Sequence, residues 1–326
     1  MSLAPFVHAM ARGPARARNL TRDEAREAMA LILSGNAAPE AIGALFMLMR
    51  YRGETAEEIA GFVDAMRAHV PSYGGLRVDV DWPSYSAGRS RGLPLFLLSA
   101  KLVAQAGHRV LLHGWNSHQN PVADVRAALK RIGISQATTA QSAQAGLDAD
   151  GIAYVPLEAK SERLLELLKL RDVLGLRSPV NTALRAWNPS GAALSVQGVF
   201  HPPYRDLQRD AAALLGQQNL LVLKGGGGEF ERNPSKDIAL HGLLKGAAVD
   251  QTAPSFVDDV RRMNGGEDSP AALGEIWAGA LDDPFARAVV IGTAGLVLMQ
   301  LENLTEAQGR ERAEALWANR LTRIAA

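Results

Sequence analysis

Two polar segments contain the residues of this sequence best suited to chemistry. The first, residues 84–92 (SYSAGRSRG), combines hydroxyl groups with Arg89 and Arg91 just before an apolar stretch. Guanidinium groups and the backbone N–H groups at a helix start both bind anions. The second, residues 112–121 (LHGWNSHQNP), follows a short apolar run. Because parallel strands end at one edge of a sheet, we expect both segments to open on the same edge.

A third segment, residues 220–234 (LLVLKGGGGEFERNP), passes from an apolar run into four glycines. Glycines let the backbone approach a ligand closely, and Lys224, Glu229 and Glu231 could serve a phosphate or a divalent cation. The segment is not a P-loop, because no Gly-Lys-Ser/Thr follows at the required spacing. A flexible loop with solvated charges is the alternative interpretation, and the pattern leaves both open.

The elements that must position these segments change in type along the chain. Capping boxes at Thr21 and Thr55 and apolar residues at helical spacing predict a bundle of three short helices over residues 21–69. From Val78 onward, short apolar runs alternate with helical patterns, which indicates an α/β domain. The predicted strands are 78–80, 109–112, 152–155, 193–199 and 220–223, and the predicted helices between them are 93–106, 122–132, 158–170 and 205–215.

The C-terminal quarter is predicted to be helical over 258–265, 270–279, 286–301 and 306–320. The apolar run 286–301 is expected to be a buried helix, not a membrane span, since charges follow it closely. We therefore predict a helical domain over 1–75 and an α/β domain with a central mixed sheet over 76–326. A segment near 165–190 is expected to return to the helical domain.

Composition narrows the class of protein. The chain has 326 residues, of which 47% are hydrophobic and 21% charged, with no cysteine and a net charge of +1. A disulfide framework is excluded and disorder is not indicated. The N-terminus has no long apolar core, so we expect a cytoplasmic protein with no membrane partner.

The order of motifs resembles a known family. LTRDEAREAMALILSG, MRYRGETAEEIAGFVDAMR, LVAQAGHRVLLHG, LRDVLGLRSPVN and LLVLKGGGGEFE together are similar to anthranilate phosphoribosyltransferase and its phosphoribosyltransferase and nucleoside phosphorylase superfamily. The resemblance implies a helical small domain, an α/β large domain, and a homodimer formed through the helical domain. Apolar residues on several faces of the second helix, including Ala44, Phe46 and Met47, agree with a partner there.

The resemblance weakens where that family does its chemistry. Its Gly-Thr-Gly-Gly-Asp loop corresponds to residues 85–91, which carry arginines, and its Lys-His-Gly-Asn-Arg-Ser loop corresponds to 112–117, without the lysine. Its Asp-Glu magnesium pair falls on Phe230-Glu231, with Glu229 as a substitute, and Arg171 matches the arginine that faces anthranilate. Each such loss typically costs about 100-fold or more in rate, so turnover of the parent reaction is not expected.

A divergent TrpD-like branch, typified by YbiB and associated with nucleic-acid binding, is the more similar one. On that resemblance, residues that contact nucleic acid or phosphate would be Ser86, Gly88, Arg89, Ser90, Arg91, Lys101, His113, Asn116, Lys224, Arg232 and Lys236. Gly114, Ser117 and Arg171 would line a ligand cleft, and Glu229 and Glu231 are weak metal candidates. No catalytic residue is assigned. Trp115 could stack on a base, although packing is the commoner role for such a residue.

Two functions follow for this sequence. The first is a non-enzymatic, phosphoribosyltransferase-like homodimer that binds DNA or RNA through phosphates with little sequence preference and requires no cofactor. The alternative is a pentosyl-transferring glycosyltransferase with a different phosphoribosyl substrate, which would need Mg²⁺. A phosphorylated small ligand is a further possible partner for the cleft.

Overall fold

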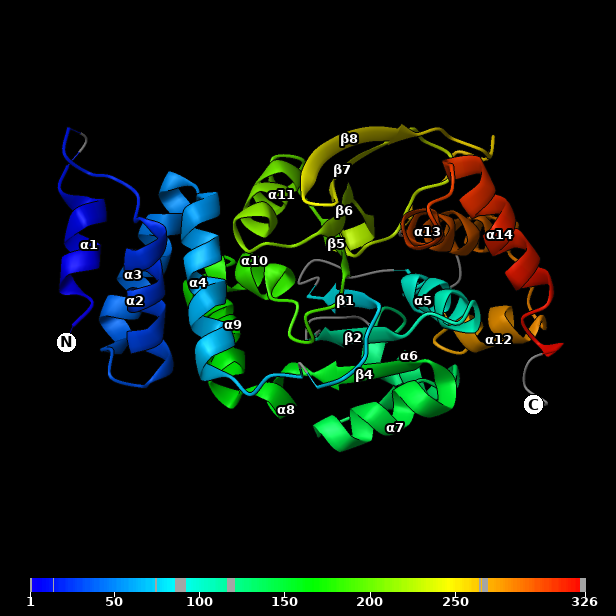
Figure 1. Cartoon of the computed structure of the whole chain (residues 1–326), viewed down its shortest axis with the longest axis horizontal. Helices are drawn as coiled ribbons and strands as arrows, with labels where there is room; N and C mark the ends of the chain where they lie inside the picture. Colours follow the sequence, from blue (N-terminus) through cyan, green and yellow to red (C-terminus); the bar gives the residue numbers. More distant parts are fainter. Residues whose placement is uncertain are drawn as a thin grey trace.

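The computed structural model describes residues 2–13, 15–73, 75–85, 92–115, 121–263, 265 and 269–322. A group of helices at the N-terminal side adjoins a larger α/β part that contains one sheet (Figure 1). The predicted fold class, a small helical domain with an α/β domain around a mixed sheet, is confirmed.

The sheet has eight strands in the order β3-β4-β2-β1-β5-β6-β7-β8. The first six are parallel to their neighbours, and β7 and β8 add an antiparallel hairpin at one end. The strands are β1 Val80–Ser84, β2 Val110–Gly114, β3 Ser135–Gln136, β4 Ile152–Pro156, β5 Leu194–Val199, β6 Asn219–Lys224, β7 Ile238–Leu244 and β8 Ala247–Ala253.

The register of the parallel strands brings the three polar segments together. Ser84 at the end of β1 lies opposite Gly114 at the end of β2, and Val199 at the end of β5 lies opposite Lys224 at the end of β6. The expectation that the segments leave from the same edge of the sheet is therefore confirmed. We call this edge, defined by Ser84, Gly114, Val199 and Lys224, the strand-end edge.

The helical part begins with α1 Ala4–Ala11, α2 Arg22–Leu33, α3 Pro39–Arg52 and α4 Ala56–His69. Both predicted capping boxes are present, at Thr21 and at Thr55. Its hydrophobic core also takes in residues of α9 Glu162–Leu174 and α10 Pro179–Ala186, such as Leu164 and Leu184. A segment distant in sequence thus completes the bundle and joins it to the sheet.

The idea that Phe46 is a surplus apolar residue for a partner is wrong. Its side chain is fully buried in the helical core, where its ring centroid lies 6.1 Å from that of Phe62. Ala44 remains exposed and Met47 is half-buried on the same helix. A helical pattern cannot separate these cases, because α1 and α10 cover faces of α3 that the sequence leaves unassigned.

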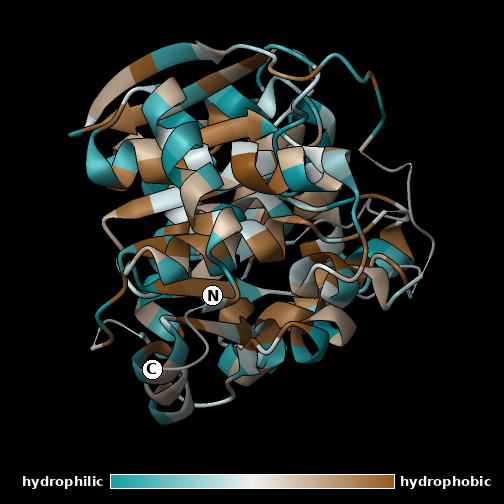
Figure 2. Cartoon of the chain, turned by 90° about the vertical axis from the view of Figure 1, so that its right-hand side faces the viewer, coloured by the Kyte–Doolittle hydropathy of each residue, from teal (hydrophilic) through white to brown (hydrophobic). Residues whose placement is uncertain are grey.

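The α/β part is completed by α5 Phe96–Gln105, α6 Val125–Arg131, α7 Ala140–Asp150, α8 Leu157–Lys160, α11 Tyr204–Leu214, α12 Ala272–Ala278, α13 Pro284–Glu302 and α14 Glu306–Ala318. Helix α13 is long and apolar enough to cross a membrane, yet 78% of its most apolar window is buried inside the fold. It packs against α5 and α14 as a core helix, as predicted. Figure 2, turned by 90° from Figure 1 and coloured by hydropathy, shows largely apolar strands inside and polar segments on the outer helices.

Some predicted elements differ from the structure. Residues 258–263 are not helical, and the predicted helix over 158–170 is divided between α8 and α9 at Ser161, whose hydroxyl caps the second helix. The hairpin β7–β8 is not predicted from the sequence because most of the β8 residues are exposed, so its apolar alternation is weak. Its turn uses Lys245 and Gly246, both with positive φ.

Candidate functional site

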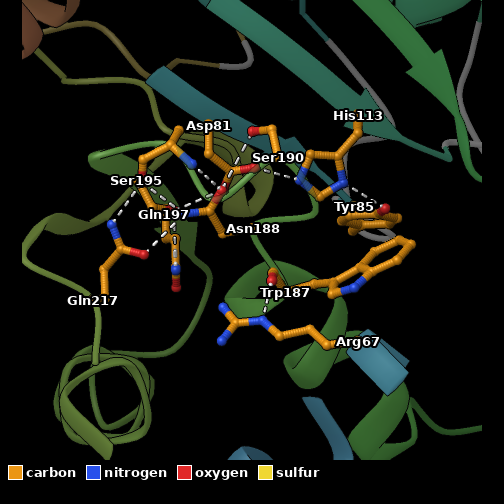
Figure 3. Close-up of polar contacts among 11 residues, drawn as sticks. Arg67, Asp81, Tyr85, His113, Trp187, Asn188, Ser190, Ser195, Gln197 and Gln217 are labelled. Carbon is orange, nitrogen blue, oxygen red and sulfur yellow. Dashed lines mark hydrogen bonds and ion pairs between the residues drawn. The ribbon is translucent and has the colours of Figure 1, made fainter. Parts of the chain in front are cut away.

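A buried hydrogen-bond network lies at the base of the first two polar segments. Asp81 of β1 is fully buried, and its carboxylate lies 3.0 Å from His113 Nε2 (Figure 3). A carboxylate only accepts, so Nε2–H donates and, in the neutral ring, Nδ1 accepts from the Tyr85 hydroxyl at 2.8 Å. Burial raises the pKa of Tyr85 well above its ordinary value, which keeps this hydroxyl protonated as the donor.

The position of this hydrogen-bond network indicates a structural role. Ser195 Oγ of β5 donates to the other Asp81 oxygen at 2.8 Å, so the carboxylate ties β5 to the His113 ring. His113 is 1% exposed and Trp187 packs edge-on against it at 6.1 Å. The predicted phosphate contact by His113 does not fit this burial. The hydrogen-bond network instead fixes Tyr85, which lies near the start of the first polar segment.

The acidic residues of the glycine-rich segment are closed in by the protein. Glu229 and Glu231 are both fully buried. Ser84 Oγ donates to Glu229 at 2.9 Å, and the backbone N–H of Phe96, the first residue of α5, donates to Glu231 at 2.9 Å. The glycines bring the chain back on itself, since a Cβ on Gly225 would lie 1.7 Å from the Glu229 carbonyl oxygen. The need for glycine here is therefore internal close packing.

These carboxylates do not fit a magnesium site. Within the described ranges, no group of three or more His, Cys, Asp or Glu side chains is placed to hold a metal ion. Mg²⁺ prefers octahedral oxygen ligands and retains several of its waters. Here both carboxylates are fully buried, and one oxygen of each accepts a hydrogen bond from Ser84 or from the Phe96 N–H. We assign no step to a metal at these residues.

An arginine-rich cavity opens beside the strand-end edge. Its volume is about 260 Å³, and it lies where α3, α10 and α11 meet the end of β5. We call it the arginine pocket, after the four arginines in its lining. It is lined by Arg50, Glu54, Arg171, Gly175, Leu176, Arg177, Ser178, Asn181, Thr182, Arg185, Val199, Phe200, His201, Tyr204 and Gln208.

The arginines of the pocket differ in how they are held. Arg185 is buried and donates to the Asn181 side chain at 2.5 Å and to the Tyr85 carbonyl at 3.1 Å. Burial, aided by repulsion from Arg177, lowers the pKa of Arg185 to about 10, so it stays charged at neutral pH. Arg50 donates to the Tyr204 hydroxyl.

Arg177 is held least. It is half-buried, and in the part of the chain that the structure describes its guanidinium forms no hydrogen bond or ion pair. Its guanidinium lies over the Phe200 ring, with the ring centroid 5.8 Å away. Burial lowers the pKa of Arg177, and repulsion from Arg171 and Arg50 adds to this effect. An anion in the pocket would relieve this repulsion.

The pocket has little negative charge of its own. Glu54 is the only carboxylate among the lining residues, and its oxygen accepts from the Tyr204 hydroxyl at 2.8 Å. Burial and this carboxylate raise the pKa of Tyr204 to about 12. Four guanidinium groups against one carboxylate leave a net positive cavity.

The other predicted cations are dispersed. Lys224 and Lys236 are exposed, and Lys224 stands at the strand-end edge. Arg232 is 1% exposed and is bonded to Glu306 and to the Pro254 carbonyl, so it cannot reach a polyanion. Lys101 donates to the Ile132 carbonyl and lies over the Trp277 ring, away from the pocket.

Several predicted residues lie outside the described part of the chain: Ser86, Gly88, Arg89, Ser90, Arg91, Asn116 and Ser117. The described neighbours mark where these segments begin. Trp115 is half-buried against the helical core, and Lys169 lies 5.6 Å from its ring centroid. Gly114 ends β2, and Arg171 lines the arginine pocket.

Sequence reasoning missed most of the pocket. The sequence patterns do not identify Arg50, Arg177 or Arg185, nor Phe200 and Tyr204. The one available signal was the pair Arg171 and Arg177 around a glycine, which indicates a helix end with two cations. Asp81 is not identified either, although an acid between the apolar residues Val80 and Trp82 is a sign of a buried polar contact.

The fold agrees with comparisons to known proteins. A family model described as the helical bundle domain of a glycosyl transferase family matches residues 5–70. The anthranilate phosphoribosyltransferase of Sinorhizobium medicae is 30% identical over 255 residues, which span 78% of this chain and 72% of that protein. The chain belongs to the anthranilate phosphoribosyltransferase-like family.

Other relatives extend this picture. The Escherichia coli protein named YbiB, described as uncharacterized, is 28% identical over 241 residues, spanning 72% of this chain and 74% of YbiB. The crystal structure of anthranilate phosphoribosyltransferase from Thermus thermophilus superposes with a TM-score of 0.80 at 21% identity, covering 97% of this chain and 94% of that one. The Saccharomyces cerevisiae enzyme in complex with PRPP and Mg gives a TM-score of 0.77 at 15% identity, covering 97% and 93%. At these identities the two structures show a shared fold.

Proposed function

We propose that this protein binds nucleic acid through its phosphates at the strand-end edge, with little sequence preference and without catalysing pentosyl transfer. The observation that supports this function is the arginine pocket, in which four guanidinium groups face one carboxylate. An arginine fork matches the geometry of a phosphate and can donate two hydrogen bonds to it. Arg177, half-buried and without a hydrogen bond in the described chain, is the group best prepared to do so.

The overall charge does not oppose this proposal. The chain carries a net charge of only +1, so attraction to a polyanion depends on where the cations gather. The pocket adjoins the edge where Lys224 is exposed and where the segment containing Arg89 and Arg91 departs from β1. Each phosphate that is neutralised releases condensed counterions, which drives binding at low salt.

The absence of turnover is part of the proposal. Phosphoribosyl transfer requires a held pyrophosphate with its Mg²⁺ while positive charge develops on the ribose carbon. The family's magnesium pair falls on Phe230 and Glu231, with Glu229 as the substitute acid. Glu229 accepts from Ser84, and Glu231 accepts from the first residue of α5. Their position supports a structural role.

A second candidate function is pentosyl transfer to an anionic acceptor, with Mg²⁺ held by groups other than Glu229 and Glu231. The observation that favours it is the presence of Arg171 in the lining of the pocket, at the position that matches the family's anthranilate-facing arginine. A steady-state assay with PRPP, Mg²⁺ and anthranilate separates the two candidates. Turnover near about 1 per second, within the usual range of enzymes, would replace the binding proposal with this one.

Nucleic-acid binding is tested by fluorescence anisotropy with labelled oligonucleotides over a range of salt concentrations. We expect log K to fall linearly with log salt, and Arg177→Ala to weaken binding to all sequences while reducing the slope by about 0.7–0.9. Arg312→Ala on α14 is the matched control, because it removes the same charge from a residue 44% exposed and remote from the pocket. No binding at low salt, or equal effects of both substitutions, would remove the proposal.

We also propose a homodimer through the helical part, which would double the phosphate contacts, and a cytoplasmic location. Exposed Ala44 and half-buried Met47 on α3 support the partner surface there. Sedimentation equilibrium at micromolar concentration should show a dimer that Met47→Glu weakens. A monomer in the unsubstituted protein would contradict this.

A further inference from the structure

A half-exposed aromatic ring stands at the arginine pocket. Phe200 follows directly after β5 and is 44% exposed, although it lies in the pocket lining. His201 packs edge-on against it at 4.8 Å, and the Arg177 guanidinium lies 5.8 Å from its centroid. The ring is therefore held in place by two neighbours while much of its surface stays open. A fixed, open aromatic ring is a stacking platform for a flat group.

Two polar groups in the wall of the pocket also lack partners. Ser178 Oγ and Gln208 Oε1 have no hydrogen bond within the described chain, although the two residues are only 3% and 1% exposed. Gln208 Nε2 donates to the Thr182 carbonyl at 3.0 Å, which orients the amide. Buried polar atoms normally have partners, so each such atom needs an explanation. These two residues make this part of the pocket wall polar.

The size of the cavity limits what can enter. At about 260 Å³ it lies near the lower end of the ligand pockets that proteins form, about 300–1,000 Å³. A double helix, whose bases are stacked inside, cannot place a base there. A single unstacked nucleotide can present its phosphate and its base to different walls of the same cavity.

We infer that the arginine pocket binds one nucleotide unit, with its phosphate at Arg177 and its base stacked on Phe200. This inference rests on the proposed nucleic-acid binding and extends it to a preference for single strands. Ser178 and Gln208 lie in the wall of the same cavity. Because every base has a flat face, such a pocket adds affinity without strong sequence preference. A free mononucleotide has the same chemistry, and the experiment below separates the two sources.

The test measures anisotropy with three ligands: a labelled single strand, the same strand with abasic residues, and the corresponding duplex. Phe200→Ala should weaken single-strand binding by roughly 5- to 150-fold, the usual effect of losing one stacked base. Binding of the abasic strand and of the duplex should change by less than about two-fold, because the phosphate contacts remain. The salt slope should not change, since no phosphate contact is removed.

Two further variants keep the result interpretable. Phe200→Tyr retains a stacking ring and should restore single-strand affinity, which shows that Phe200→Ala acts through the ring and not through misfolding. Leu214→Ala is the control, because Leu214 is an apolar residue of similar exposure, 42%, outside the pocket lining. Equal weakening of single strand, abasic strand and duplex by Phe200→Ala would overturn the inference.

The outcomes also distinguish this inference from the proposed function. Salt-dependent oligonucleotide binding that Phe200→Ala leaves unchanged would overturn the nucleotide pocket and retain phosphate binding. No oligonucleotide binding at low salt, together with calorimetric binding of adenosine monophosphate that Phe200→Ala abolishes, would overturn the proposed function and retain the pocket for a free nucleotide.

Discussion

The strand-end edge has an acidic side and a basic side, and the protein treats them in opposite ways. Glu229 and Glu231 are fully buried, and one oxygen of each accepts a hydrogen bond, from the Ser84 hydroxyl and from the Phe96 N–H. On the other side, Arg177 has no hydrogen bond within the described chain, and Ser178 and Gln208 each keep a polar atom without a partner. Each acid is thus bonded to the fold by at least one hydrogen bond, whereas the Arg177 guanidinium on the basic side forms no hydrogen bond or ion pair among the described residues.

The two sides of the strand-end edge show why family membership does not by itself assign the chemistry of the site. On the acidic side, one carboxylate accepts from Ser84 at the end of β1 and the other from the N–H of Phe96 at the start of α5. The basic side, which joins the helical part to the sheet, has the composition of an anion site. A shared fold therefore does not by itself assign the chemistry of a cleft, which has to be argued from the residues of the site.

The largest expected effect breaks the acidic side. Glu231→Ala removes the acceptor of the Phe96 N–H at the start of α5, leaves this donor buried and unpaired, and opens a small cavity. The free energy of unfolding should fall by about 2–4 kcal/mol. Urea denaturation followed by circular dichroism measures this change.

Two controls give that measurement its meaning. Glu57→Ala, on the exposed first turn of α4, should change the free energy of unfolding by no more than about 0.5 kcal/mol. Arg177→Ala should be similarly mild, because this arginine has no ion pair in the described chain and is repelled by its neighbours. A stable Glu231→Ala protein, or a strongly destabilised Arg177→Ala protein, would reverse the comparison between the two sides.

A smaller effect concerns Lys160, a cation that the protein has closed in. It is 8% exposed, donates to the Pro71 carbonyl, and its Nζ lies 3.5 Å from the Tyr73 ring centroid. Burial lowers the pKa of Lys160 from 10.5 to about 8. Between these values the unfolded chain holds more protons than the folded one, so stability from this group rises with pH over about 8 to 10.5.

The gain should be about 1–2 kcal/mol between pH 7 and 9.5. Thermal unfolding across this range compares the unsubstituted protein with Lys160→Met, which should lack the rise. Lys169→Met, at an exposed position on α9, serves as the matched control. Parallel pH profiles for the unsubstituted protein and Lys160→Met would show that burial does not control this lysine.

Much of the fold could be predicted from the chain because its signals are local. Two capping boxes begin α2 and α4, and runs of apolar residues mark β2, β4, β5 and β6. The meeting of three segments at one edge follows from the parallel order of strands. The hairpin β7–β8 could not be predicted in the same way, since exposure weakens its pattern.

The arginine pocket could not be predicted because no local signal describes it. Arg50 comes from the helical part, Arg177 from the link before α10, and Tyr204 from the start of α11. The bond between Arg50 and Tyr204 joins residues 154 positions apart. For Arg232 the prediction is wrong. Its charge beside a glycine-rich segment indicated a phosphate contact, but in the structure it is bonded to Glu306 of α14.

The contact between Ser84 and Gly114 has a consequence for how such a site can diverge. A Cβ on Gly114 would lie only 2.0 Å from the Ser84 carbonyl oxygen, so glycine alone lets the ends of β1 and β2 approach this closely. The spacing at which the two polar segments leave the sheet is thus set by main-chain atoms. Residues beyond that point can be exchanged over generations without altering the width of the opening. Related proteins can in this way bind different ligands while the spacing between the ends of β1 and β2 stays the same.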